Sequence, residues 1–214
     1  MIHDGQPVLT RGKRVGDADA AMILVHGRGA NAESILTLVP ELTHPQFAYL
    51  APQASGNTWY PYPFMQPIER NEPHLSSALA TLDRVLTQVI EAGIPAERII
   101  LLGFSQGACL ATEFAARNAR RYGGVVGFSG GLIGPDGTPR DYPGLMDGTP
   151  VFLGCSDVDS HIPKERVEET ADVFRRLGAN VTMRLYPNME HTINQDEIAF
   201  VRSMVSSTVA DRDA

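Results

Sequence analysis

The stretch IILLGFSQGACL, residues 99–110, decides the fold of this chain of 214 residues. An apolar, strand-like run ends at Gly103, Ser105 stands at the centre of a Gly-x-Ser-x-Gly pattern, and an Ala/Leu-rich helical pattern begins directly afterwards. A strand, a sharp turn and a helix in this order lift a serine hydroxyl out of the end of a sheet, above the start of the helix. The turn is so tight that the flanking positions must lack a β-carbon. We therefore expect Ser105 to be a nucleophile.

A second match to the same pattern, GFSGG at residues 127–131, makes Ser129 a competing candidate. It also follows an apolar run, residues 125–126. The residues after it, LIGPDG at 132–137, are typical of a loop and show no helical period. Ser129 therefore lacks the helix that the turn requires, and the pattern favours Ser105.

Composition is that of a globular protein, with 43% hydrophobic and 20% charged residues. No apolar run approaches the roughly 18 residues of a membrane span. The N-terminus has no basic start followed by an apolar core, so we expect no secretory signal and a cytoplasmic location. The two cysteines, Cys109 and Cys155, stand in apolar surroundings and are expected to be buried thiols.

The net charge of −7, from 18 basic and 25 acidic side chains, argues against a nucleic-acid partner. Proteins that bind phosphate backbones need clustered Lys and Arg. No Cys/His spacing suggests a metal site, so we expect neither a metal nor another cofactor.

Strand-like runs alternate with helical patterns along the chain. Strands are expected at residues 20–25, 47–51, 99–103, 124–128, 151–155 and 181–185, and helices near 31–39, 75–90, directly after Ser105, and near 167–177 and 198–205. Two long irregular segments, 52–73 and 130–148, interrupt the pattern and suggest functional loops. This order predicts an α/β fold with a mostly parallel sheet and helices on both faces, as one domain over residues 1–214. The last five residues are expected to fray.

A serine nucleophile needs a base to accept its proton and an acid to orient the base. Where this turn occurs, the three follow the chain in the order Ser, acid, His, which leaves His161 and His191 as bases. His191 is favoured because it stands in a loop between a strand and the last helix, from which its ring can reach Ser105. The acid is expected after strand 151–155, where Asp157 and Asp159 both stand, and either can instead be a turn residue.

Together these motifs resemble the phospholipase/carboxylesterase family, small α/β-hydrolases without a lid that include the acyl-protein thioesterases. The matching pieces follow the family's order: HGRG at 26–29, WY at 59–60, GFSQG at 103–107, DSHIP at 159–163 and YPNMEH at 186–191. The resemblance implies an α/β-hydrolase fold with no separate cap domain. It favours Asp159, which fits the family's Asp-Pro-x-Val-Pro frame with Ser160 and Ile162 as replacements. Asp157 stays open, because the loop has two more residues than is usual in the thioesterases.

The resemblance also implies an oxyanion hole made by the backbone N–H groups of Arg28 and Gln106. The Arg28 side chain either only accompanies its backbone or places a cation at the mouth of the site, which would favour an anionic or polar substrate. An acyl or leaving-group pocket is expected to be lined by Trp59, Tyr60, Phe64 and Leu132. These four residues can instead pin their loops to the body of the protein or fill the core.

The expected activity is therefore that of a serine hydrolase that cleaves carboxylic esters through an acyl-enzyme. Small-molecule esters with short to medium acyl chains are favoured, because the sequence has no basic membrane-facing helix and no long apolar loop. The alternative is an acyl-protein thioesterase or lysophospholipase acting on lipid-derived acyl groups, and a remote one is a non-catalytic binding protein. The sequence leaves open the natural acyl chain, the leaving group and the choice between monomer and homodimer.

Overall fold

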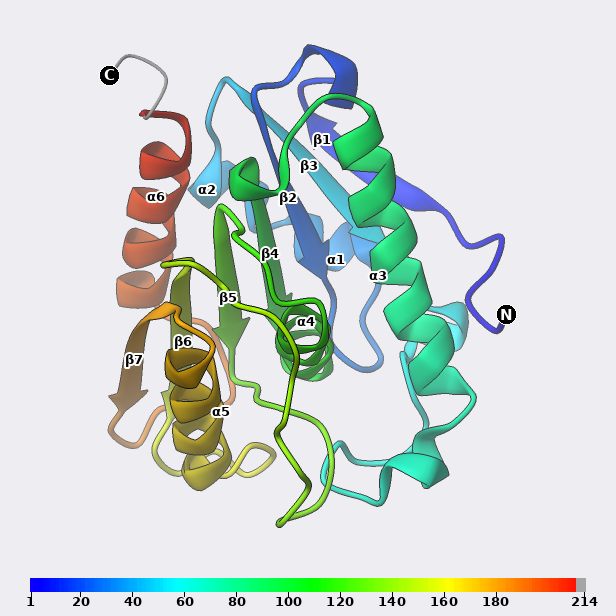
Figure 1. Ribbon diagram of the computed structural model, residues 1–214, viewed down its shortest axis with the longest axis vertical. Coiled ribbons are helices and arrows are strands. Elements are labelled where there is room, and N and C mark those ends of the chain that lie inside the picture. The colour runs from blue at the N-terminus through cyan, green and yellow to red at the C-terminus, as the bar shows by residue number, and fades with distance from the viewer. Residues whose placement is uncertain (211–214) are drawn as a thin grey trace.

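The strand that bears the serine motif, β4 (Ile99–Phe104), lies at the centre of a seven-stranded sheet in the computed structural model, which describes residues 1–210 (Figure 1). The strand order is β1-β3-β2-β4-β5-β6-β7. Within the described residues β1 pairs antiparallel with β3, and every other neighbouring pair is parallel. The other strands are β1 (Val8–Gly12), β2 (Ala20–Val25), β3 (Phe47–Pro52), β5 (Gly124–Phe128), β6 (Pro150–Ser156) and β7 (Asn180–Tyr186).

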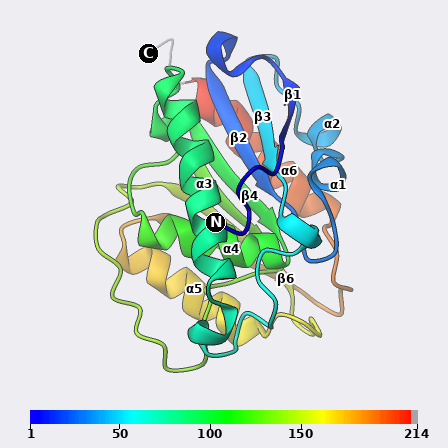
Figure 2. The same ribbon diagram turned by 90° about the vertical axis from the view of Figure 1, so that its right-hand side faces the viewer.

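Helices cover both faces of this sheet, as Figures 1 and 2 show. One face packs against α1 (Ala32–Leu36), α2 (Val39–Leu42) and α6 (Gln195–Ala210), and the other against α3 (His74–Glu91), α4 (Gln106–Arg117) and α5 (Lys164–Arg176). Short helical turns span Val15–Asp17, Ser55–Asn57, Ile68–Asn71 and Ala96–Arg98. The expected mostly parallel sheet with helices on both faces is confirmed.

The fully buried strand β2 explains why the central strands read as continuous apolar runs. Side chains alternate between the two faces of a strand. Ala21, Ile23 and Val25 join the core under α3, α4 and α5, while the even-numbered residues of β2 join the core under α1, α2 and α6. Because both cores exclude water, every position of this strand must be apolar.

Two features of the N-terminal part differ from the expectation. The helix expected at 31–39 is divided into α1 and α2, because Pro40 is tolerated only in the first turn of a helix and so begins a new one. Strand β1 was not expected. Its residues are mostly exposed and do not alternate, and they join the sheet through backbone pairing with β3 at its edge.

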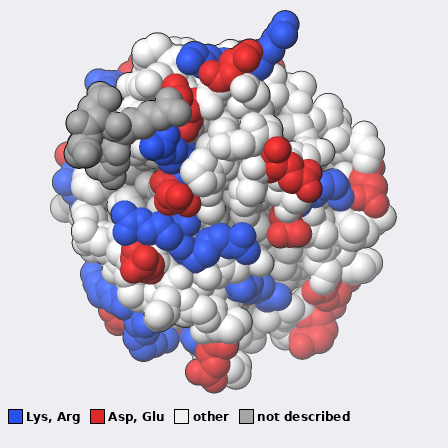
Figure 3. All heavy atoms as spheres, turned by 45° about the horizontal axis from the view of Figure 1, so that its top comes forward, with Lys and Arg blue, Asp and Glu red and all other residues white. Residues whose placement is uncertain are grey.

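The two cysteines are free and buried, as expected. The last five residues were expected to fray, and four of them, 211–214, lie outside the described residues. Within residues 1–210, no helix is both long enough and apolar enough to cross a membrane. On the face of the molecule seen in Figure 3, basic side chains lie beside acidic ones.

Candidate active site

Ser105 occupies a strained turn between β4 and α4. Its backbone has φ 55° and ψ −121°, a conformation that costs energy for a residue with a β-carbon. The N–H of Ser105 donates to the carbonyl of Phe128 on the neighbouring strand at 2.9 Å. A β-carbon at Gly103 would lie 2.2 Å from the carbonyl oxygen of Gly107, and one at Gly107 would lie 2.1 Å from that of Val25. The two glycines therefore permit the close approach that the motif predicted.

The structure brings together Ser105, His191 and Asp159. Nε2 of His191 lies 2.9 Å from Oγ of Ser105, and Nδ1 lies 2.7 Å from Oδ2 of Asp159. The His191 ring also packs against the ring of Phe104, with centroids 5.1 Å apart. Because an ionised carboxylate can only accept, Nδ1 donates its proton to Asp159 and leaves Nε2 free to accept the hydroxyl proton of Ser105.

The Asp159 carboxylate is held ionised although its side chain is fully buried. Burial raises the pKa of this group, but hydrogen bonds from His191 and from the N–H groups of His161 and Ile162 outweigh it and lower the pKa below 3.8. The two backbone donors lie 2.8 and 3.0 Å from Oδ1. The carboxylate is therefore a fixed negative charge behind the His191 ring.

Asp157, the other candidate acid, has a different set of partners. Its Oδ1 accepts from the N–H of Asn188 at 2.8 Å, and its own N–H donates to the carbonyl of Tyr186 at 3.0 Å. These bonds connect the loop after β6 to the loop that leads to His191. Asp157 thus has the turn role that the sequence left open.

The rejected alternatives, Ser129 and His161, also have defined positions. Ser129 is fully buried, and it is not one of the residues that line the cavity next to Ser105. The exposed His161 ring packs edge-on against His191, with centroids 4.8 Å apart and an interplanar angle of 69°. It lines the cavity but holds no bond to Ser105 among the described contacts.

A cavity of about 390 Å³ opens beside Ser105 and His191, at the carboxyl ends of the strands. Tyr60 and Phe64 line it, as expected, and so do both residues of the predicted oxyanion hole, Arg28 and Gln106. Several further lining residues were not predicted from the sequence: Pro63, Phe104, Cys109 and Ile162. Cys109 is one helical turn after Ser105, and this spacing could have revealed it. Burial raises its pKa to about 12, so it is a thiol.

Trp59 does not line the cavity, which corrects its assignment to the pocket wall. Its ring packs against two imidazoles, with centroids 5.4 Å from His3 and 5.0 Å from His26. Its Nε1–H donates to the carbonyl of His26 at 2.9 Å. The indole therefore pins the irregular segment to the loop after β2.

Leu132 is also absent from the cavity lining and is fully buried, which corrects its assignment too. Its N–H donates to Oγ1 of Thr170 at 2.9 Å, and its carbonyl accepts from the Arg166 guanidinium at 2.8 Å. These bonds hold the backbone around Leu132 against α5. Its side chain fills the core.

The Gln106 side chain holds the segment that forms one cavity wall. Its Oε1 accepts from the N–H of Trp59 at 3.0 Å, and its Nε2 donates to the carbonyl of Tyr60 at 2.8 Å. The residue after the serine thus has two functions in this structure. Its backbone begins α4, and its amide fixes the position of Tyr60.

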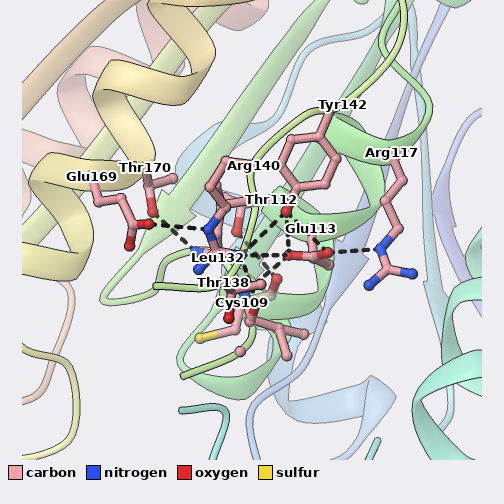
Figure 4. A network of polar contacts seen from close by, with 12 residues as sticks. Cys109, Thr112, Glu113, Arg117, Leu132, Thr138, Arg140, Tyr142, Glu169 and Thr170 are labelled. Carbon is pink, nitrogen blue, oxygen red and sulfur yellow. Dashed lines mark hydrogen bonds and ion pairs between the residues drawn. The ribbon is translucent and has the colours of Figure 1, made fainter. Parts of the chain in front are cut away.

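A buried polar network, shown in Figure 4, supports the same segment from the loop between β5 and β6. Glu113 on α4 accepts from the N–H of Ile133 at 2.9 Å and from the Tyr142 hydroxyl, and it lies 3.9 Å from the Arg140 guanidinium. Both Glu113 and Arg140 are almost fully buried, at 1% and 5% side-chain exposure. The network fixes the loop between β5 and β6, whose Gly134 N–H donates to the carbonyl of Phe64 at 2.8 Å.

The Arg28 side chain is bonded to the irregular segment 52–73. Its guanidinium donates to the carbonyls of Pro61 at 2.8 Å and of Tyr62 at 2.9 Å. The residue itself is exposed at the cavity. This position is compatible with both hypotheses from the sequence: a side chain that only accompanies its backbone, or a cation at the mouth of the site.

Comparison with known proteins gives one consistent result. A family model described as phospholipase/carboxylesterase matches residues 13–209. The acyl-protein thioesterase 1 of Candida albicans is 27% identical over 215 residues, which cover 90% of this chain and 93% of that protein. The crystal structure of a phospholipase/carboxylesterase from Dyadobacter fermentans has a TM-score of 0.91 and 42% identity, covering 94% of this chain and 97% of that one.

A more distantly related structure is similar to this chain in fold alone. The acyl-protein thioesterase 2 of Zea mays has a TM-score of 0.71 at 17% identity, covering 95% of this chain and 99% of that one. The expected α/β-hydrolase fold is confirmed by these structures and by the family match.

Proposed function

Because this chain belongs to the phospholipase/carboxylesterase family, we propose that it hydrolyses small-molecule carboxylic esters through an acyl-enzyme formed on Ser105. The observation that carries the proposal is the hydrogen-bonded series from Asp159 through His191 to Ser105, with distances of 2.7 and 2.9 Å. This geometry supplies a nucleophile, a base within reach of its proton and an acid that orients the base.

In the acylation step, His191 Nε2 accepts the Ser105 proton while Oγ attacks the ester carbonyl carbon. Asp159 stabilises the imidazolium that forms and keeps the proton on Nδ1. The negative charge on the former carbonyl oxygen would be bound by the backbone N–H groups of Arg28 and Gln106. A donor of this kind contributes roughly 10²–10³ in kcat.

The imidazolium then donates its proton to the leaving oxygen, which departs as an alcohol. In the second step, His191 removes a proton from water, the hydroxide attacks the acyl carbon, and Ser105 regains its proton as the carboxylic acid leaves. Each step returns His191 to the neutral state.

Short to medium acyl chains are the proposed substrates. The cavity of about 390 Å³ is at the lower end of the size range of small-molecule sites, and aromatic side chains, Tyr60 and Phe64, form part of its wall. The thioesterase alternative is favoured by the Candida albicans relative, whose name is acyl-protein thioesterase 1. A cytoplasmic location and a monomeric or homodimeric state remain predictions.

Hydrolysis of 4-nitrophenyl esters from acetate to palmitate, by the parent protein and by Ser105→Ala, tests the proposal. We expect the highest kcat/KM on short to medium chains and a loss of roughly 10³-fold or more in the variant. Preference for palmitate would favour the lipid-directed alternative. Equal turnover by the variant, or no turnover on any ester, would contradict the proposal, and the second result would favour the binding-protein reading.

A further inference from the structure

The cavity beside Ser105 contains a positive charge that no nearby carboxylate neutralises. Arg28 lines the cavity and is exposed there. Within residues 1–210, none of the ion pairs involves Arg28. Its two hydrogen-bond acceptors are the carbonyls of Pro61 and Tyr62. Carbonyls orient a guanidinium but bear no net charge, so the full positive charge of the side chain remains at the cavity.

The guanidinium is held in one orientation and still has donors to offer. Of its five N–H groups, the bonds to the two carbonyls use two. The remaining N–H groups lie in one plane, and this geometry matches the two oxygens of a carboxylate. Because the protein has already fixed the side chain, less conformational entropy is lost when an anion binds.

The remaining lining contains nothing that would repel an anion. Among the described residues that line the cavity there is no Asp or Glu, although the chain as a whole has a net charge of −7. The other ionisable side chains on the lining are His161, His191, the Tyr60 phenol and the buried thiol of Cys109, and burial keeps the last two neutral by raising their pKa values. The Asp159 carboxylate lies behind His191 with a fully buried side chain and does not line the cavity.

We propose that the Arg28 side chain binds a carboxylate of the substrate, so that the preferred substrates are esters or thioesters with a carboxylate several bonds from the reacting carbonyl. This inference rests on the proposed function and narrows its substrate class. It gives Arg28 two separate proposed functions, since its backbone N–H is the proposed oxyanion donor and its guanidinium binds a distant part of the substrate. A neutral acyl chain would leave this charge with only the two carbonyls and the Tyr60 ring, whose centroid lies 5.9 Å from the guanidinium carbon, and with no anionic partner.

Two matched pairs of substrates test the inference. In the first, the half-ester of adipic acid with 4-nitrophenol is compared with 4-nitrophenyl hexanoate, which has the same chain length without the carboxylate. In the second, 4-(butyryloxymethyl)benzoate is compared with benzyl butyrate, which places the charge on the leaving group instead. The quantity measured is the ratio of kcat/KM for the anionic ester to that for the neutral one.

We expect the parent to prefer the anionic member of at least one pair, and Arg28→Gln to lower that ratio by tenfold or more, which is the effect of losing a hydrogen bond between charged groups. Arg28→Lys should give an intermediate ratio, because it keeps the charge without the planar donors. Arg70→Gln is the matched control: Arg70 packs over the Tyr62 ring at 4.4 Å but does not line the cavity, so the ratio should stay at the parent value.

The inference is overturned if Arg28→Gln leaves both ratios at the parent values, or if Arg70→Gln lowers them equally, which would indicate a general field effect. If the neutral esters are still hydrolysed in that case, the proposed esterase function stands and only the anion site has failed. If no ester is turned over, calorimetric titration with adipate decides: binding to the parent that Arg28→Gln abolishes supports the anion site, and no binding to the parent overturns it.

Discussion

Nε2 of His191 lies 2.9 Å from Oγ of Ser105, although 86 positions of the chain separate the two residues. Ser105 follows the central strand β4, and His191 follows β7 at the edge of the sheet. Both strands run in the same direction, so their carboxyl ends meet at one edge, where loops can converge. The contact between His191 and Ser105 therefore depends on the loop after β7. Asp157 anchors this loop by accepting a hydrogen bond from the Asn188 N–H.

The identity of the acid gives the first prediction. Asp159→Asn should lower kcat by roughly 10³–10⁴, because an amide no longer selects the imidazole tautomer that accepts the serine proton. Asp157→Asn should lower it less than tenfold, since the amide oxygen can still accept from the Asn188 N–H. Steady-state kinetics of both variants on one ester provide the comparison. A larger loss in Asp157→Asn than in Asp159→Asn would assign the acid role to Asp157.

The turn at Ser105 gives the second prediction. Gly107→Ala should prevent accumulation of folded protein or lower its melting temperature strongly, because the new methyl group would lie 2.1 Å from the Val25 carbonyl oxygen. Gly16→Ala is the control, since a β-carbon there has no atom within 4 Å and the backbone is not left-handed. Thermal unfolding followed by circular dichroism distinguishes the two. Equal melting temperatures would show that the close approach is not required.

These local features explain which parts of the fold could be predicted. The strand, the glycines and the helix around Ser105 are adjacent in sequence, so the pattern alone encodes the turn. The apolar runs of β2 and β5 likewise reflect burial on both faces. Strand β1 escaped prediction because its residues are mostly exposed and its place in the sheet comes from backbone pairing with β3.

The cavity wall could be predicted only in part, because it depends on contacts between distant segments. Tyr60 and Trp59 are neighbouring aromatic residues and both are fully buried, yet Tyr60 lines the cavity and Trp59 packs against His3 and His26 instead. Nothing in the local sequence distinguishes them. The position of Phe64 likewise depends on a hydrogen bond from Gly134, in a loop that the chain reaches much later.

The buried network around Glu113 gives the third prediction. Glu113→Ala should lower the free energy of unfolding by about 2–4 kcal/mol, because it leaves the Ile133 N–H and the Tyr142 hydroxyl without this acceptor and removes one of the two carboxylates near the Arg140 guanidinium. Arg175→Ala is the control. Its ion pair with Asp172 is exposed, with side-chain exposures of 48% and 64%, and its loss should change stability by less than about 1 kcal/mol. Urea unfolding of both variants and the parent measures the difference, and similar losses would contradict the assignment.

The fourth prediction concerns Glu197, a fully buried residue in the first turn of the last helix. Burial raises the pKa of its carboxyl from 4.5 to about 7, although the Asn194 N–H donates to it at 2.8 Å. Because the folded state binds the proton more tightly than the unfolded state, the contribution of Glu197 to stability falls as pH rises from 4.5 to about 7 and is constant above that.

Glu197→Gln removes this titration. The variant should therefore gain on the parent by roughly 2–3 kcal/mol in free energy of unfolding between pH 5 and pH 7.5. Urea unfolding of both proteins at the two pH values tests this, and groups that titrate in both proteins cancel in the difference. A stability difference that does not change with pH would show that Glu197 ionises normally.

The central claim, that Ser105 is the nucleophile activated by His191, is tested most directly by covalent labelling with a fluorophosphonate followed by mass spectrometry of the proteolysed protein. The account predicts one label per chain, located on Ser105. It also predicts that Ser105→Ala takes up no label and that His191→Gln is labelled at least 10²-fold more slowly. Labelling on Ser129, or uptake by Ser105→Ala at the parent rate, would contradict it.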